Sequence, residues 1–452
     1  MQSGGGGICR KVVESTNAIT QMNHICPPPP LFALALATLA AGLLTVRGAP
    51  VTLTPDPGTT SWPVEMSAYA REGYDSNVYA TNANGALADH GSATTTFGLR
   101  VAVSLPAPAG SPGNGLTLAY APEQTRFSQS AAEDNTVHRL TLQSSGTAGD
   151  WSWLLDEAGT YVDGSHTSLI YLNGGTTGNF SAYTLALPRE RRAQFQDRTK
   201  AWLRCDLGEF FLRAGGNVQA YDLRTVCSAT TGYLNFVDRY DANAGFDAGW
   251  RLAKEIALTL GWRDGFQRQA LVPGIVKLSS SNHYDRLLAG LEGQPVSWLV
   301  LSLVGGPDFR SYSAKAPTVT DLTPTCLYVE GSATATLGNT DSVILGLKQW
   351  RWVASTGKYT YDDKTVSLSW KHRITASLGL QLSGQAQQSA FIGCVRKDNL
   401  YSLGVQLQYA LTQRWSLNAD YSWQRGADEV EADPQAREFT RHTGGLSIKC
   451  SL

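Results

Sequence analysis

Apolar and polar residues alternate over long stretches of this chain. In residues 97–105, 246–252, 374–383, 401–410 and 415–424, every second residue is apolar and most residues between are polar or small. Successive side chains of a β-strand point to opposite faces, so each stretch predicts a strand with one apolar and one polar face. This period of two excludes a fold built mainly from helices.

Such strands fit either a soluble β-sandwich or propeller, with the apolar faces inside, or a membrane barrel, with the apolar faces outside. The stretches run for about 9–13 residues, the length of tilted membrane strands. Their apolar faces often end in aromatic residues, as expected where lipid meets water. These aromatic residues are Trp250, Trp262, Tyr401, Tyr409, Trp415, Tyr421 and Trp423. A sheet in hydrocarbon must close on itself, so we predict an all-β transmembrane antiparallel up-and-down barrel, with a soluble secreted β protein as the alternative.

Turns and loops give the number of strands. Short turns are expected near residues 109–110, 146–147, 208–209, 254–255, 293–294, 338–339, 373 and 412–413. Longer loops are expected near 81–92, 122–133, 158–195, 214–243, 266–282, 306–324, 353–361, 384–397 and 425–437. Short turns on one side and long loops on the other are typical of outer-membrane barrels. This pattern predicts about 18 strands, and 16 remain possible because segments 214–243 and 280–305 alternate poorly.

The first part of the chain predicts a targeting segment. Residues 31–44 are apolar and follow four prolines, and Arg10 and Lys11 lie upstream. About 14 apolar residues are too few for a membrane-spanning helix but suit the core of a signal peptide. We expect residues 1–49 to be an export signal and residues 50–452 to form a single barrel. A buried N-terminal helix is the alternative.

Composition narrows the partners and the chemistry. Lys and Arg (37) nearly balance Asp and Glu (38), so no general basic field exists to bind nucleic acid. No histidine has a metal-ligand spacing and no nucleophile motif is present. We therefore expect no catalysis, no metal and no cofactor. An outer-membrane hydrolase with His166 or His283 at the rim is a less favoured alternative. Cys205 and Cys227 could pair across a hairpin or stay free.

The polar faces supply candidates for the lining of a pore. These are Arg100, Arg204, Asp206, Arg251, Arg263, Lys371, Gln381, Gln406, Asn418 and Asp420. A basic group, Arg189, Arg191 and Arg192, ends the longest expected loop, 158–195. Folded into the pore, it would form a constriction that favours anions. It is otherwise a solvated outer loop, and opposed lumen charges could instead plug the barrel.

The last segment, residues 445–452, also alternates and ends on Leu452. A closing strand with an outward apolar residue at its end fits the place where barrel-assembly machinery engages. Membrane lipid is the other expected partner, small solutes are possible ones, and no motif specifies an oligomer.

Two stretches resemble a known family. Residues 72–79 (EGYDSNVY) are similar to the first-strand signature of the putative β-barrel porin 2 family of Gram-negative outer-membrane proteins. Residues 409–423 (YALTQRWSLNADYSW) are similar to its penultimate hairpin. The resemblance implies an outer-membrane barrel with no assigned solute and no catalytic residues. The function we expect is passive, porin-like passage of small hydrophilic solutes, and the main alternative is a non-conducting structural or adhesive barrel plugged by its long loop.

Overall fold

The computed structural model describes residues 64–80, 91–105, 115–164, 191–224, 237–253, 255–271, 278–313, 324–355, 359–393, 396–430 and 439–452. All of them lie in the unit Leu43–Leu452. The predicted signal, residues 1–49, lies outside the described residues. Within them no helix has the length and apolar character needed to cross a bilayer.

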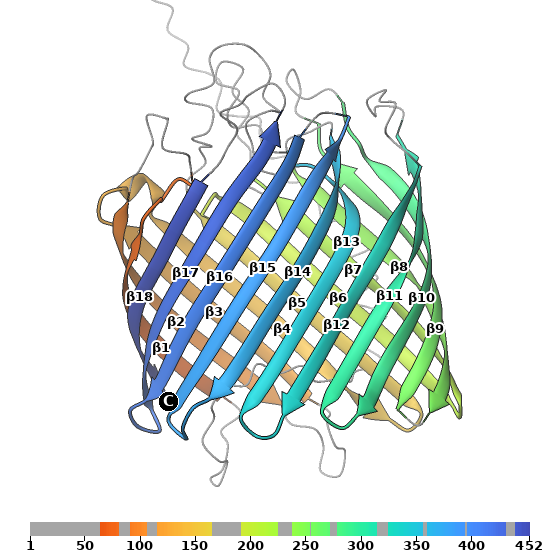
Figure 1. Ribbon diagram of the computed structural model, residues 1–452, viewed down its shortest axis with the longest axis horizontal. Helices are drawn as coiled ribbons and strands as arrows, with labels where there is room; N and C mark the ends of the chain where they lie inside the picture. Colours follow the sequence, from red (N-terminus) through yellow and green to blue (C-terminus); the bar gives the residue numbers. More distant parts are fainter. Residues whose placement is uncertain are drawn as a thin grey trace, which may run out of the picture. The chain divides into compact units, whose positions relative to one another are not determined.

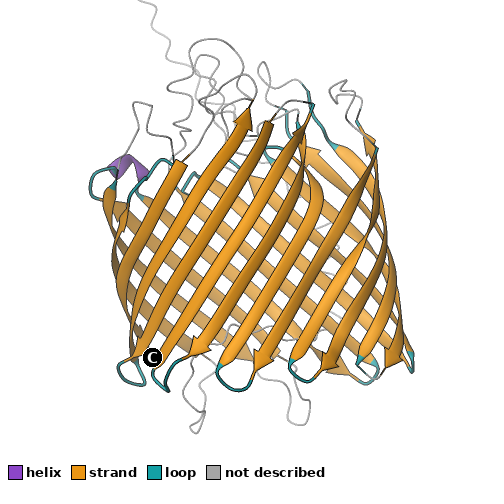
Figure 2. Ribbon diagram, in the orientation of Figure 1, coloured by secondary structure: helices purple, strands orange, loops and turns teal. Residues whose placement is uncertain are grey.

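The described residues form eighteen strands and one short 3-10 helix, Ala131–Glu133 (Figure 2). In chain order the strands are β1 Val64–Asp75, β2 Ser92–Leu105, β3 Gly115–Phe127, β4 Asn135–Ala148, β5 Trp151–Asp163, β6 Gln194–Leu207, β7 Phe210–Asp222, β8 Arg239–Ala253, β9 Ile256–Gln269, β10 Asn282–Val296, β11 Leu299–Tyr312, β12 Thr325–Leu337, β13 Asp341–Val353, β14 Thr360–Arg373, β15 Leu378–Ile392, β16 Arg396–Ala410, β17 Trp415–Val430 and β18 Phe439–Ser451.

Each strand pairs with the next in antiparallel register, and β1 also pairs with β18. The sheet is therefore closed, with slanted strands (Figure 1). The closing ladder runs from Ser67↔Ser451 to Asp75↔Thr443, so the last strand completes the barrel as predicted. The predicted antiparallel barrel of about 18 strands is confirmed, and the alternative of 16 is wrong.

The poorly alternating segments contain strands after all. The loop expected at 214–243 spans only the residues between Asp222 and Arg239, and the loop expected at 158–195 lies between Asp163 and Gln194. Similarly, β3 continues to Phe127 through Pro122. Glycine, proline and polar residues on both faces hide the period of two, but backbone hydrogen bonding to neighbouring strands still keeps these residues in the ladder.

Several predicted turns are confirmed and others shift by a few residues. Gly208 and Gly338, at φ +72° and +61°, lie in short turns as expected. The turn expected at 146–147 lies at Gly149 instead, where φ is +58°. The stretch 374–377, expected to be strand, is a turn in which the Ile374 and Thr375 N–H groups donate to the Leu378 carbonyl. The position of each turn is thus determined more closely by a left-handed glycine or a local hydrogen bond than by the alternation of apolar and polar residues.

The two faces of the sheet differ as predicted. Large apolar side chains are exposed on the outer face, for example Leu260 (70%), Leu446 (69%) and Phe246 (65%). The aromatic residues Trp250, Trp262, Tyr401, Tyr409, Trp415 and Tyr421 are also exposed. The polar residues that alternate with them face inward.

Candidate functional site

Contacts between strands that are not neighbours identify the inner face. Arg213 on β7 bonds Glu292 on β10, at 3.1 and 2.9 Å, across two intervening strands. Arg71 on β1 similarly bonds Asp420 on β17, across β18. Side chains converge only on the concave side of a curved sheet, so these residues line the lumen. The polar lumen is the candidate functional site.

A cluster of charges lies on the lumen face of β6 to β10. It consists of the guanidinium groups of Arg204, Arg213, Arg251 and Arg263 with the carboxylates of Asp206, Asp247 and Glu292. We call these seven residues the basic cluster. Each carboxylate contacts two guanidinium groups: Arg204 and Arg251 reach Asp206 at 2.8 and 2.5 Å, for instance. Four cations against three anions leave one positive charge in excess.

A buried aromatic ring supports this cluster. Phe211 points inward from β7 and is fully buried. The Arg204 guanidinium lies 3.7 Å from the centre of its ring, and that of Arg213 lies 5.7 Å away. A cation over an aromatic face is attracted by the ring quadrupole. Phe211 therefore holds both guanidinium groups against the wall and leaves their charge toward the lumen.

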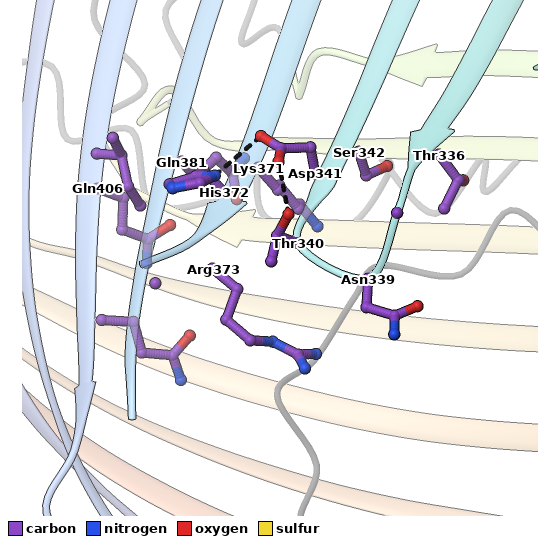
Figure 3. Close-up of a pocket in the computed structure, with 14 residues that line it drawn as sticks. Thr336, Asn339, Thr340, Asp341, Ser342, Lys371, His372, Arg373, Gln381 and Gln406 are labelled. Carbon is purple, nitrogen blue, oxygen red and sulfur yellow. Dashed lines mark hydrogen bonds and ion pairs between the residues drawn. The ribbon is translucent and has the colours of Figure 1, made fainter. Parts of the chain in front are cut away.

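A second group of predicted residues meets near the short turns, at the end where strand β13 begins. A cavity of 490 Å³ is lined there by Lys371, Arg373, Gln381 and Gln406, among others (Figure 3). Within the described residues neither Lys371 nor Arg373 forms an ion pair, so their charge is presented to the lumen. Asp341, which also lines this cavity, is bonded instead by His372 at 2.9 Å.

The remaining predicted residues lie apart from these two groups. Arg100 makes a long, exposed ion pair with Glu65 at 3.4 Å. Asn418 donates to the Ser447 hydroxyl at 3.4 Å, and Asp420 is held by Arg71. The structure therefore gathers Arg204, Asp206, Arg251 and Arg263 in one place and Lys371, Gln381 and Gln406 in another.

The predicted constriction residues fall partly outside the described structure. Arg189 and most of the long loop, residues 165–190, are not among the described residues. Arg191 bonds Asp75 at 3.5 Å and Glu133 at 3.4 Å, and it lines a 560 Å³ cavity on the inner face of β18 and β1 to β6. Arg192 is buried. The side chain of Arg191 therefore reaches the lumen, but its charge is matched by carboxylates.

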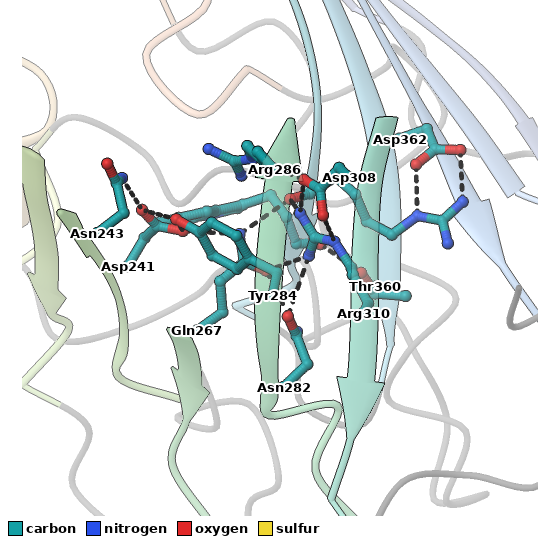
Figure 4. Close-up of polar contacts among 12 residues, drawn as sticks. Asp241, Asn243, Gln267, Asn282, Tyr284, Arg286, Asp308, Arg310, Thr360 and Asp362 are labelled. Atoms are coloured by element: carbon teal, nitrogen blue, oxygen red, sulfur yellow. Dashed lines mark hydrogen bonds and ion pairs between the residues drawn. The ribbon is translucent and has the colours of Figure 1, made fainter. Parts of the chain in front are cut away.

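A third group of polar residues was not predicted. Asp241, Gln267, Tyr284, Asp308 and Arg310 form a buried network on the inner face of β8 to β11 (Figure 4). Arg310 and Asp308 are bonded at 3.0 Å, and both side chains are fully shielded from solvent. The alternation of β8 to β11 places these residues on the polar face, but nothing in the sequence distinguishes a buried network from a wet pore lining.

The candidates for catalysis do not assemble into a site in the described structure. His166 lies outside the described residues. His283 pairs with Asp264 at 2.7 Å, and both belong to the outward-facing set of β9 and β10. No group of three or more His, Cys, Asp or Glu residues suited to a metal ion occurs among the residues that were searched. Cys205, Cys326 and Cys450 are free thiols, and Cys227 lies outside the described residues.

Comparison with known proteins agrees with the resemblance seen in the sequence. Residues 352–451 match the family model described as putative beta-barrel porin 2, which confirms the likeness over the last strands of the barrel. No curated protein matches the sequence.

Solved structures that match this chain include proteins of two bacteria. OpdK from Pseudomonas aeruginosa is 14% identical, with 86% of this chain and 99% of that chain covered and a TM-score of 0.38. OccAB4 from Acinetobacter baumannii is 11% identical, with 88% and 100% covered and a TM-score of 0.40. The siderophore receptor PirA from Pseudomonas aeruginosa is 9% identical, with 86% and 80% covered and a TM-score of 0.37.

Proposed function

We propose that this protein is an outer-membrane channel for the passive passage of small hydrophilic solutes, with a preference for anions. The observation that carries the proposal is the uncompensated positive charge of the lumen. The basic cluster has one guanidinium in excess, and Lys371 and Arg373 line the cavity near the short turns without an ion pair among the described residues.

The inner and outer faces support a channel of this kind. A closed sheet with an apolar exterior leaves no unpaired backbone edge for lipid to meet. Its interior presents Arg, Lys, Gln and Asn side chains, which bind water and hydrophilic solutes. Positive side chains along a pore lower the entry barrier for anions by direct attraction, without covalent chemistry or a cofactor. The match of residues 352–451 to a porin family supports the same proposal.

Export and assembly complete the proposal. Residues 1–49 would direct the chain out of the cytoplasm, and strand β18 would be recognised by barrel-assembly machinery before it closes onto β1. The folded barrel would then contact membrane lipid through its apolar outer face.

Conductance of the purified protein in planar lipid bilayers tests this proposal. We expect stable current steps and, under a KCl gradient, a reversal potential that shows chloride to be more permeant than potassium. Silence would instead favour the non-conducting barrel.

Charge reversal on one strand tests the origin of the anion preference. Replacing Lys371 and Arg373 by glutamate should lower the chloride-to-potassium permeability ratio by a factor of about five, equivalent to about 1 kcal/mol. Lys364→Glu is the matched control, because Lys364 is exposed on the opposite face of the same strand. An unchanged ratio in the double variant would refute the role given to these two cations.

A further inference from the structure

The wall of the barrel is interrupted between β12 and β13. Their ladder runs from Leu337↔Asp341 only to Val329↔Gln349, although β13 continues to Val353. Beyond Gln349, β13 stays paired with β14 up to Val353↔Thr360. In Figure 1 the end of β13 bends away from β12. We call residues 350–355 and 359–363 the infolded segment.

The infolded segment contacts strands on a distant part of the wall. The Arg351 carbonyl accepts hydrogen bonds from Gln267 on β9, at 2.9 Å, and from Arg310 on β11, at 2.8 Å. The Val353 carbonyl accepts from Arg239 on β8 at 2.9 Å. The Ala354 carbonyl accepts from Gln269 on β9 at 2.5 Å. Side chains on three other strands thus donate four hydrogen bonds to main-chain carbonyls of the infolded segment.

These contacts require the segment to cross the lumen. Strand β9 is four positions from β13 around the sheet. Neighbouring strands are about 4.8 Å apart, so the path along the wall is roughly 19 Å. A hydrogen bond of 2.9 Å between β9 and β13 is possible only if β13 leaves the wall and takes a chord through the interior. The segment therefore occupies the part of the lumen bounded by β8 to β14, at the long-loop end.

The contacts also explain why the segment is stable there. A strand that leaves its neighbour loses a row of ladder hydrogen bonds, and buried carbonyls need new donors. The side chains of Arg239, Gln267, Gln269 and Arg310 supply them. Aromatic packing adds to this: Trp352 and Tyr361 are 1% and 2% exposed and pack with Phe391 in one cluster.

Arg239 joins the two kinds of contact. Its guanidinium lies 5.2 Å from the Trp352 ring centre and 4.8 Å from that of Tyr221, and it also donates to the Tyr361 hydroxyl at 3.0 Å. The segment is thus fixed through its main chain and its side chains at once.

We infer that the infolded segment is a constriction that limits the size of solutes entering the lumen, and that Arg239, Gln267, Gln269 and Arg310 are the residues that position it. This inference rests on the proposed channel function. The positioning residues lie on the opposite side of the crossed space from β13, so they determine how far the segment reaches inward. They need not touch the solute.

The register of β12 shows where the segment would go without them. Tyr328, Leu327 and Cys326 are the next β12 residues in register with Trp350, Arg351 and Trp352. Extension of the existing ladder would return β13 to the wall and widen the entrance. Weakening the positioning contacts should therefore raise the size limit rather than only destabilise the barrel.

Gln269→Leu is the variant that tests this role, because leucine has a similar size but donates no hydrogen bond. The Gln269 amide donates to the Ala354 carbonyl and, at 3.2 Å, to the Tyr359 carbonyl. Gln388→Leu is the matched control, since the Gln388 amide also donates a side-chain hydrogen bond, to Asn399 at 3.0 Å, but lies beside Lys364 on the outer face. In liposome-swelling assays with mono-, di- and trisaccharides, Gln269→Leu should raise trisaccharide entry relative to monosaccharide entry by at least about twofold. Gln388→Leu should leave this ratio unchanged.

A disulfide tests the position of the segment independently of transport. The Val237 N–H donates to the Ser355 carbonyl at 2.7 Å, and a direct main-chain hydrogen bond brings two residues to about the Cα spacing that a disulfide needs. Val237→Cys with Ser355→Cys, in a chain whose native cysteines are replaced by serine, should oxidise in the folded barrel and lose both free thiols. The variant that combines this oxidised disulfide with Gln269→Leu should keep the wild-type size limit, because the disulfide holds the segment in place of the lost hydrogen bonds.

The outcomes separate this inference from the proposed function. If the disulfide does not form, or if Gln269→Leu behaves like Gln388→Leu, the constriction is refuted even when the wild-type protein conducts. If the wild-type protein passes no solute, the proposed function fails. Passage by Gln269→Leu alone would then show that the segment closes the lumen, whereas silence of both would refute its role in size selection.

Discussion

The two ends of the lumen use the same residue types in opposite ways. Near the short turns, Lys371 and Arg373 line an open cavity with glutamines around them. At the long-loop end of β8 to β11, Arg310 and Asp308 are fully shielded and bonded to each other. The difference arises because the wall folds back over the second group and not over the first. A polar inward face therefore does not by itself mean a wetted one.

Among substitutions that test this difference, we expect Arg310→Leu to lower the stability of the barrel most. Arg310→Leu removes a buried cation from Asp308, Gln267 and the Arg351 carbonyl. Loss of one partner from a buried charged network costs about 3–5 kcal/mol. The same change at Arg100, whose pair with Glu65 is exposed, should cost about 0–1 kcal/mol. Loss of the unheated, folded band on a denaturing gel, measured against temperature, compares the two variants. Equal melting shifts would contradict the contrast.

A smaller effect is expected when the outer face receives a charge. Leu260→Arg places a cation on the lipid-facing surface and should cost about 2–4 kcal/mol if the position lies near the middle of the bilayer. Gln381→Arg places the same group in the lumen cavity and should be nearly neutral. Urea unfolding in lipid vesicles measures both. A larger loss of unfolding free energy in Gln381→Arg than in Leu260→Arg would show that the inner and outer faces have been assigned the wrong way round.

The Arg71–Asp420 pair should lie between the two extremes. Its two hydrogen bonds measure 3.0 and 2.6 Å, and the side chains are 22% and 36% exposed. Partial solvent screening should reduce the coupling energy to about 1 kcal/mol. A double-mutant cycle with Arg71→Leu and Asp420→Leu, followed by urea unfolding, gives this energy. The same cycle on Arg310 and Asp308 gives the coupling energy of a buried pair. A larger coupling energy for Arg71–Asp420 would mean that burial does not determine which pair is stronger.

The strand number and the two faces could be predicted because they depend on local order in the sequence. The alternation in residues 415–424 fixes which side chains of β17 share a face, whatever the strand pairs with. Glycines at positions such as 208 and 338 mark turns because they adopt a left-handed conformation at little cost. Where glycine and proline interrupt the pattern, as at Pro122, strand ends were misplaced. Neighbouring strands, not local preference, extend the ladder there.

The lumen residues were predicted as a set but not as sites. Arg204, Asp206, Arg251 and Arg263 were each assigned to the polar face from their own strands. That they join Arg213, Asp247 and Glu292 in one cluster depends on the register of β6 to β10, which brings together residues far apart in the chain.

By itself the sequence determined a closed antiparallel sheet with an apolar outside and a polar inside, because a strand exposes alternate residues to opposite surroundings. Only the tertiary structure decided which polar residues stay accessible and which are buried. The difference arises where β13 separates from β12 after Gln349. There the carbonyls of β13 accept hydrogen bonds from side chains on β8, β9 and β11. Such bonds join strands that are neighbours neither in sequence nor in the sheet, so no local pattern can reveal them.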